Sequence, residues 1–329
     1  MSARILFVTA GQIGDAVLTT GLLAHLLARH PGARVTIVAG PLPAQLFQGV
    51  PGLERLIPLA KQRHRRHWLD LWRQVRATRW DMVVDLRGSI LPWMLRARER
   101  HAMGKGRADE HRVLQLARLF RLDPPPAPTL WLREQDRAAA ARLMGEGPVL
   151  ALAPAANWLG KRWPAERFAE LALGLTAPGA VLAGARVAVA GSPGERAQTQ
   201  PVLDSLPAAR RIDLTAGFDL LTVAAALGRS RMFIGNDSGL MHIAAAMGVP
   251  TLGLFGPSPA SVYAPWGELT AVAQTDLPAA TLLAAFKAGA QAPEALMDSL
   301  PLDRVAAAAV TLFRRGAARG VDAEGMANS

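Results

Sequence analysis

The chain has 329 residues, half of them hydrophobic, which is enough to bury a large core and suggests two domains. It contains no cysteine, so disulfides, thiolate metal sites and a cysteine nucleophile are excluded, and a cytoplasmic location is expected. Lys and Arg outnumber Asp and Glu by 37 to 26, and residues 1–150 hold 23 of the basic and 12 of the acidic side chains. The whole excess of positive charge therefore lies in the first half.

The excess is concentrated in residues 61–67 (KQRHRRH) and 96–112 (RARERHAMGKGRADEHR). Such runs are typical of solvated helix faces and loops, or of a surface that attracts a polyanion such as a phosphorylated lipid, a membrane surface or nucleic acid. No nucleic-acid recognition signature accompanies the charge, so no nucleic-acid partner is expected. The residues expected to form a basic patch facing an acceptor or a membrane are Lys61, Arg63, Arg65, Arg66, Arg96 and Arg98.

Tryptophans are interleaved with these arginines, as anchors at a membrane interface would be: Trp68, Trp72, Trp80 and Trp93. No stretch has about 18 uninterrupted apolar residues, and the apolar run at residues 5–10 is too short for a signal peptide. We therefore expect a soluble or peripheral protein, with peripheral contact at the cytoplasmic face of the inner membrane.

The first half alternates strands and helices. In chain order we expect a strand at 5–9, a helix at 16–29, and strands at 34–39, 53–59 and 82–86 with helical stretches between them. The proline-rich residues 122–128 then predict a stiff extended connector, followed by a helix at 134–144 and a second break at 145–148.

The pattern restarts after this break. We expect strands at 149–153, 186–190, 232–234 and 249–255, and helices at 164–175 with Pro164 at its first position, 194–206, 240–247 and 302–313. Strands that alternate with helices predict parallel sheets covered on both faces, an α/β fold. The division expected is a first Rossmann-like domain at 1–147, a second at 148–315 and a disordered tail at 316–329, with a ligand cleft at the carboxyl ends of the strands.

Three loops that follow predicted strands contain residues with useful chemistry. In the first, Gly11 and Gly14 permit close approach of the backbone, and Asp15 is either a charge at a helix N-terminus or a general base. The second contains Lys161, which is either a surface lysine or a point charge for a diphosphate. The third, Asn236-Asp237-Ser238-Gly239 with His242 one turn later, opens a helix whose N-terminus attracts phosphate, although Asp237 alone could serve as an N-cap.

Other chemistries lack their motifs. The sequence has no G-x-S-x-G, H-E-x-x-H, P-loop or D-x-D pattern, which argues against hydrolase triads, zinc peptidases, P-loop ATPases and a required divalent metal. No cofactor is expected.

Three segments, residues 11–38, 160–172 and 233–259, resemble the heptosyltransferase family, glycosyltransferase family 9, and the similarity runs to about residue 313. The resemblance implies the GT-B architecture and an inverting, metal-independent transfer from a nucleotide diphosphate sugar, typically ADP-heptose, to a lipopolysaccharide-core or related acceptor. It matches Asp15 with the family's proposed catalytic base, Lys161 with the lysine at the donor phosphates and Asp237 with the aspartate at the sugar hydroxyls.

The resemblance further implies that Ser238 and Gly239 hold the diphosphate, with His242 in the same helix. It places Phe218 against the base and Glu195 near the ribose. The chain departs from many relatives at 296–300, where they have cysteines, and in the alanine-rich loop before Lys161. Two alternatives remain open: a GT-B-like nucleotide-sugar epimerase or hydrolase, and a non-catalytic module that binds a nucleotide sugar or a polyanion.

Overall fold

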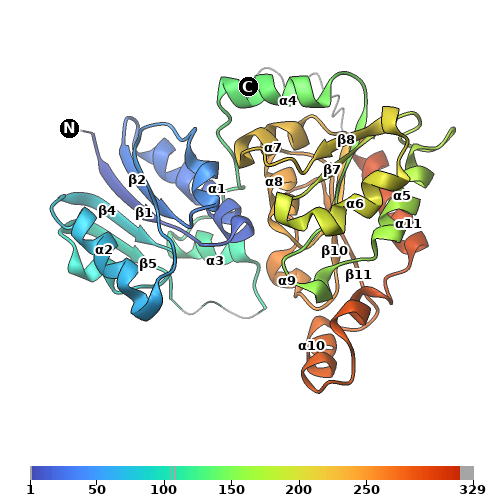
Figure 1. Cartoon of the computed structure of the whole chain (residues 1–329). Helices are drawn as coiled ribbons and strands as arrows, with labels where there is room; N and C mark the ends of the chain where they lie inside the picture. The colour runs from blue at the N-terminus through green and yellow to red at the C-terminus, as the bar shows by residue number, and fades with distance from the viewer. Residues whose placement is uncertain (1, 105, 107–108, 319–329) are drawn as a thin grey trace. The chain divides into compact units, whose positions relative to one another are not determined.

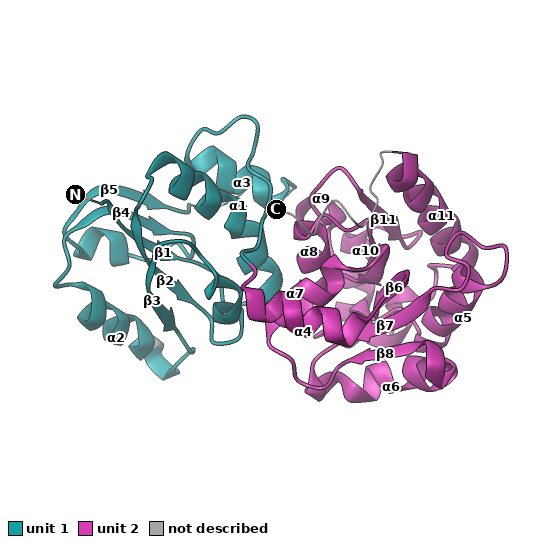
Figure 2. Cartoon of the chain, turned by 90° about the horizontal axis from the view of Figure 1, so that it is seen from above, with its two compact units in different colours: residues 1–131 teal, residues 132–329 magenta. Residues whose placement is uncertain are grey.

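The computed structural model describes residues 2–104, 106 and 109–318, and Figure 1 shows its elements. The chain forms two compact units, residues 1–131 and 132–329, coloured separately in Figure 2. Each unit is built around one parallel sheet.

The first unit has a five-stranded parallel sheet in the order β3-β2-β1-β4-β5. Its strands are β1 (Arg4–Val8), β2 (Arg34–Ala39), β3 (Leu53–Pro58), β4 (Trp80–Asp85) and β5 (Ala97–Ala102). Helices α1 (Ile13–Arg29) and α3 (Arg112–Leu119) lie on one face and α2 (Arg66–Val75) on the other (Figure 2). The short 3-10 helices are η1 (Pro43–Phe47), η2 (Arg63–Arg65) and η3 (Leu91–Met94). The central strands β1, β2 and β4 are almost entirely buried, as strands covered on both faces must be.

The second unit has a six-stranded parallel sheet in the order β11-β10-β9-β6-β7-β8. Its strands are β6 (Val149–Ala153), β7 (Arg186–Ala190), β8 (Arg211–Leu214), β9 (Met232–Asn236), β10 (Thr251–Phe255) and β11 (Thr270–Gln274). Its helices are α4 (Glu134–Met144), α5 (Ala165–Thr176), α6 (Arg196–Ser205), α7 (Leu220–Gly228), α8 (Gly239–Ala246), α9 (Ala260–Tyr263), α10 (Ala279–Lys287) and α11 (Leu302–Ala318). The 3-10 helices are η4 (Leu159–Lys161), η5 (Pro193–Glu195), η6 (Ala208–Arg210) and η7 (Pro293–Met297).

In both sheets the strand order reverses beside the first strand of the unit. The reversal falls between β1 and β4 in the first unit and between β6 and β9 in the second. Doubly wound parallel sheets bind ligands outside the carboxyl ends of the strands at this switch point. The predicted α/β fold with two Rossmann-like sheets is confirmed.

Several elements differ from the sequence expectation. Helix α1 begins at Ile13 rather than Ala16, so Asp15 lies in its first turn, and Pro164 is the N-cap of α5 rather than its first residue. Strands β5 and β11 were not expected, because edge strands tolerate charged and half-exposed residues and so lack the apolar signature. Helices α3 and α10 were also missed.

The boundary between the units follows packing rather than the Gly145–Pro148 break. Helix α4 contacts α7 of the second unit, so the division falls after Trp131 instead of after residue 147. The connector expected at 122–128 is irregular and belongs to the first unit, where Thr129 N donates to Thr20 Oγ1 of α1 at 3.0 Å. Helix α11 continues to Ala318, so the first residues of the expected tail are helical, and residues 319–329 lie outside the described part.

The N-terminus of α4 is fixed by a buried ion pair. The guanidinium of Arg133 donates from Nε to Asp136 Oδ2 at 2.8 Å and from its NH2 nitrogen to Oδ1 at 2.6 Å, and the Asp136 side chain is 1% exposed. Burial opposes ionisation of this carboxyl, but the hydrogen bonds from Arg133 outweigh it and hold the pKa of Asp136 below its usual value.

We expect Asp136→Asn to lower the free energy of unfolding at neutral pH by about 1.5–3 kcal/mol, because it removes a charge-assisted pair. Because its pKa is lower in the folded state, the Asp136 carboxyl stabilises the fold fully above its unfolded-state pKa of about 3.9. This stabilisation is lost as the pH falls through the folded-state pKa. Urea unfolding followed from pH 7 to pH 3 should therefore show the two proteins converging below about pH 4. A constant difference across that range would contradict the assignment.

Candidate functional site

Four loops at the carboxyl ends of strands in the second unit hold the predicted donor residues. Lys161 follows β6, Glu195 follows β7, Phe218 follows β8 and Asp237 follows β9. Because β6 and β9 are neighbours at the switch point, the loops with Lys161 and Asp237 start side by side.

Lys161 and Asp237 form an ion pair across this switch point. Lys161 Nζ donates to Asp237 Oδ2 at 2.7 Å, and the two side chains are 26% and 8% exposed. A carboxylate this buried requires a cation or hydrogen bonds. The N-cap of α8 is Ser238, so the alternative in which Asp237 is only an N-cap is wrong.

The neighbouring Asn236 holds the Lys161 loop against the sheet. Its side chain is fully buried, its Nδ2 donates to Pro154 O at 2.7 Å, and its Oδ1 accepts from Trp163 N at 3.1 Å. Both ends of the loop are thereby tied to the end of β9. Sequence reasoning placed Asn236 in the turn but gave it no role, because a buried amide bonded to two distant backbone groups leaves no local pattern.

Replacing Asn236 by the nearly isosteric Leu should leave a buried N–H and a buried C=O without their partner. Each such loss costs about 1–3 kcal/mol, so we expect a clear drop in the urea midpoint and a looser Lys161 loop. Hydrogen exchange of the Trp163 amide measures the second effect directly. Unchanged protection of that amide would show that the loop is held by other contacts.

The segment that follows α10 supports the same loop. Gly160 is buried, and a Cβ atom there would lie 2.7 Å from Leu296 Cδ1 and 2.8 Å from Trp158 Cζ2. Trp163 Nε1 donates to Leu300 O at 2.8 Å, and Arg167 reaches the same carbonyl at 2.9 Å. Three apolar residues of this segment are buried in the core: Leu296, Met297 and Leu300.

Helix α8 points its N-terminus at the ion pair. Its first residue, Gly239, follows directly on Asp237 and Ser238, and the amides of a first helical turn have no partner within the helix. Among the described residues, none bonds the buried Oγ of Ser238. His242, one turn further, is 4% exposed. This turn therefore offers hydrogen-bond donors and a helix dipole beside Lys161, an arrangement that suits a phosphate group.

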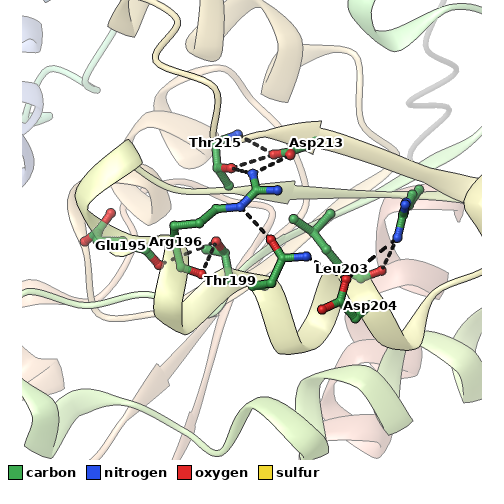
Figure 3. A network of polar contacts seen from close by, with 9 residues as sticks. Glu195, Arg196, Thr199, Leu203, Asp204, Asp213 and Thr215 are labelled. Carbon is green, nitrogen blue, oxygen red and sulfur yellow. Dashed lines mark hydrogen bonds and ion pairs between the residues drawn. The ribbon is translucent and has the colours of Figure 1, made fainter.

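The Glu195 side chain forms a capping box with Ser192 at the start of η5. Its Oε2 accepts from both the amide and the hydroxyl of Ser192 at 2.8 Å. Figure 3 shows the adjacent Arg196 reaching from α6 to the end of β8, where it meets Asp213 Oδ2 and Thr215 Oγ1, both at 2.5 Å. Glu195 is thus held at the carboxyl edge of β7, and its ribose role stays a prediction.

The same network affects the Asp213 carboxyl. Burial there favours the neutral form, but hydrogen bonds from Thr215 and Arg196 outweigh it and lower the pKa of Asp213. Phe218 follows in the next loop, half-buried, just before the N-cap Asp219 of α7. This loop is therefore anchored on both sides of Phe218, whose contact with a base also stays a prediction.

In the first unit, Asp15 lies half-buried in the first turn of α1, after the loop that leaves β1 at the switch point. Gly14 is helical, and Gly11 is exposed with room for a side chain. The backbone of Gly11 lies close to Gly40, where a Cβ atom would be 2.8 Å from Gly11 Cα, and the approach of Gly11 and Gly14 to a donor stays a prediction. The loop conformation therefore depends on a glycine that follows β2, which the sequence analysis did not single out.

The residues of the expected basic patch lie at two ends of the first sheet. Lys61, Arg63, Arg65 and Arg66 follow β3 at its carboxyl end, whereas Arg96 directly precedes β5 and Arg98 is its second residue. Because all strands of a parallel sheet run in the same direction, the first group lies at the carboxyl end of the strands and the second at their amino end. The four tryptophans also differ: Trp80 is 3% exposed and its Nε1 donates to Val75 O, so it is a core residue and cannot anchor a membrane, whereas Trp93 is 69% exposed.

In the described part of the chain, His, Asp and Glu side chains form no group of three or more suited to holding a metal ion. No helix among the described residues is both long and apolar enough to cross a bilayer.

Two doubly wound parallel sheets, one in each unit, are typical of the GT-B architecture of glycosyltransferases. The family model of glycosyltransferase family 9 (heptosyltransferase) matches residues 111–285, and the chain belongs to this family.

Individual relatives agree with this. The chain is 26% identical over 322 residues to lipopolysaccharide heptosyltransferase 1 of Pseudomonas aeruginosa, covering 85% of this chain and 86% of the relative. Lipopolysaccharide heptosyltransferase 2 of Salmonella typhimurium is 25% identical over 296 residues, covering 78% and 83%.

Solved structures show the same fold. The family 9 glycosyl transferase of Veillonella parvula superposes with a TM-score of 0.79 at 24% identity, covering 95% of this chain and 98% of that one. The ADP-heptose lps heptosyltransferase II of E. coli gives a TM-score of 0.75 at 21% identity, covering 95% and 99%.

Proposed function

We propose that this glycosyltransferase moves a heptose from ADP-heptose to a hydroxyl of a lipopolysaccharide-core acceptor, with inversion and without a metal ion or other cofactor. The observation that supports it most is the Lys161–Asp237 pair at the N-terminus of α8, in a chain of family 9. Three of the four proteins named above are lipopolysaccharide heptosyltransferases, and one of these three is named for ADP-heptose.

The second unit is proposed to hold the donor. The diphosphate would accept hydrogen bonds from Ser238 Oγ and from the amides of the first turn of α8, and Lys161 would turn from Asp237 to a phosphate oxygen. Asp237, released from the lysine, would then accept hydrogen bonds from sugar hydroxyls. As the glycosidic bond to phosphate breaks, the negative charge that develops on the diphosphate is stabilised by the same groups.

Asp15 is proposed as the general base. An acceptor hydroxyl is a weak nucleophile at neutral pH, and a carboxylate that takes its proton as it attacks the anomeric carbon accelerates the step. Attack on the face opposite the diphosphate inverts that carbon in one displacement and needs one base, unlike the carboxylate pair of a retaining glycosidase.

The first unit is proposed to bind the acceptor, whose phosphates would meet the arginines that follow β3. The acceptor is lipid-linked, so the protein would work in the cytoplasm as a peripheral protein on the inner face of the membrane.

The donor is tested by thermal shift of the purified protein with ADP-, GDP-, UDP- and dTDP-sugars, since a ligand of the folded state raises its apparent stability. We expect the ADP-sugar to give the largest shift. Incubation with ADP-heptose and deacylated lipopolysaccharide core in the presence of EDTA should then yield the heptosylated product. Consumption of the donor without acceptor would favour an epimerase or hydrolase, and binding without turnover across an acceptor panel would favour a binding module.

A further inference from the structure

An apolar groove of about 380 Å³ lies in the first unit between α2 and the segment that leads from β4 to β5. It is lined on the helix side by Trp68, Leu69 and Trp72 and on the other side by residues 88–91 and Met94. The base of the groove belongs to the packed core, because Trp68 and Trp72 pack against the core cluster that contains Leu71 and Leu91.

Large apolar side chains project from the rim of this groove into solvent. Ile90 and Trp93 are each 69% exposed, Met94 is 51% exposed, and Leu69 on the facing helix is 46% exposed. Half of the exposed large hydrophobic side chains in the described part of the chain thus gather here. An exposed apolar patch of this kind marks an interaction surface.

The charge around the groove identifies the partner. Residues 61–76, which lead into α2 and run along it, contain six Lys or Arg and one Asp, a net charge of +5. Arg87 stacks over the Trp68 ring at 5.0 Å and Arg76 over the Trp72 ring at 4.9 Å, so cations are fixed directly on the aromatic residues of the groove. Arg66 and Arg73 on α2 are exposed beside them.

We propose that this surface, the α2–η3 face, docks on a bilayer that contains anionic phospholipid. Ile90, Trp93 and Met94 enter the interfacial region of the lipid. Trp68 and Trp72 of the groove lie at headgroup depth, and the arginines contact lipid phosphates. The inference deepens the proposed function, because a lipid-linked acceptor meets the protein at such a surface. Gly88 and Ser89 of the groove lie three and four residues after the end of β4, a strand that borders the switch point beside the loop that leads to Asp15.

The test is flotation of the full chain with vesicles of phosphatidylcholine alone and of phosphatidylcholine with phosphatidylglycerol, without any sugar donor or acceptor. We expect binding to the anionic vesicles only, weakened by added salt. Ile90→Ser with Met94→Ser should lower the partition coefficient at least about tenfold, because each side chain loses apolar burial in the lipid. Arg66→Gln with Arg73→Gln should lower the partition coefficient on anionic vesicles, because two contacts with lipid phosphates are lost.

The matched control is Leu277→Ser, which replaces a leucine of similar exposure in the second unit and should bind vesicles as the parent does. All variants change exposed residues, and their thermal transitions verify folding. The proposal is overturned if the parent chain does not float with anionic vesicles, or if the Ile90/Met94 variant floats equally well. It is also overturned if the parent is a dimer that this variant dissociates, because the face would then bind a second copy. Since no sugar is present, failure of the proposed transfer activity leaves these results unaffected.

Discussion

Asp15→Asn is expected to lower kcat for sugar transfer by about 10²–10⁴-fold, the range that general-base catalysis supplies. Asn has the shape of Asp but cannot take the proton of the acceptor hydroxyl. Because Asp15 belongs to the first unit and the proposed donor residues to the second, affinity for ADP measured by calorimetry should remain within a factor of about two of the parent.

The control for this variant is Asp109→Asn, which neutralises an exposed carboxylate in a turn of the same unit and should keep full activity. Substantial turnover by Asp15→Asn would remove Asp15 from the mechanism. The residue would then be what its position in the first turn of α1 also allows, a negative charge that favours the helix N-terminus.

Lys161→Met is expected to have two effects with one cause. It leaves the 8%-exposed carboxylate of Asp237 without its cation, so the free energy of unfolding should fall by about 1.5–3 kcal/mol in urea titrations. It also removes the proposed contact with the diphosphate, so ADP should bind about 10–150-fold more weakly, the same free energy expressed as an equilibrium constant.

A double-mutant cycle separates the pair from its surroundings. Asn at position 237 carries no charge, so Lys161→Met combined with Asp237→Asn should be more stable than the sum of the two single effects implies. Strict additivity would show that the ion pair contributes no coupling energy. Lys287→Met, an exposed lysine of α10 in the same unit, serves as the control and should change neither stability nor ADP affinity.

The fold and much of the proposed donor site were predictable, because buried parallel strands and glycine-rich turns leave local patterns. The run Phe233–Gly239 predicts the end of a strand and the start of a helix within seven residues. In the structure β9 ends at Asn236 and α8 begins at Gly239. The pairing of Lys161 with Asp237 was not predicted, since it depends on β6 and β9 being neighbours, a fact of topology that no local spacing contains.

The charge patterns predicted the structure less well than the apolar and glycine patterns did. The arginines at 96–100 suggested a loop or a solvated helix face, yet they lie on or beside β5 at the edge of the sheet, where alternate side chains need no apolar cover. Trp80 was grouped with Trp93 on composition alone, and only packing distinguishes a core indole from an exposed one. The partners of Asn236 lie 73 and 82 residues away, beyond any sequence window.

Leu300 accepts hydrogen bonds from both Trp163 and Arg167, more than 130 residues earlier in the chain. While the ribosome is still making the protein, the loop that holds Lys161 therefore lacks this brace until residue 300 has left the exit tunnel. A nascent chain stalled before that point should bind nucleotide poorly even though β6 through β11 are already complete. The order of synthesis thus places completion of this loop close to the end of translation.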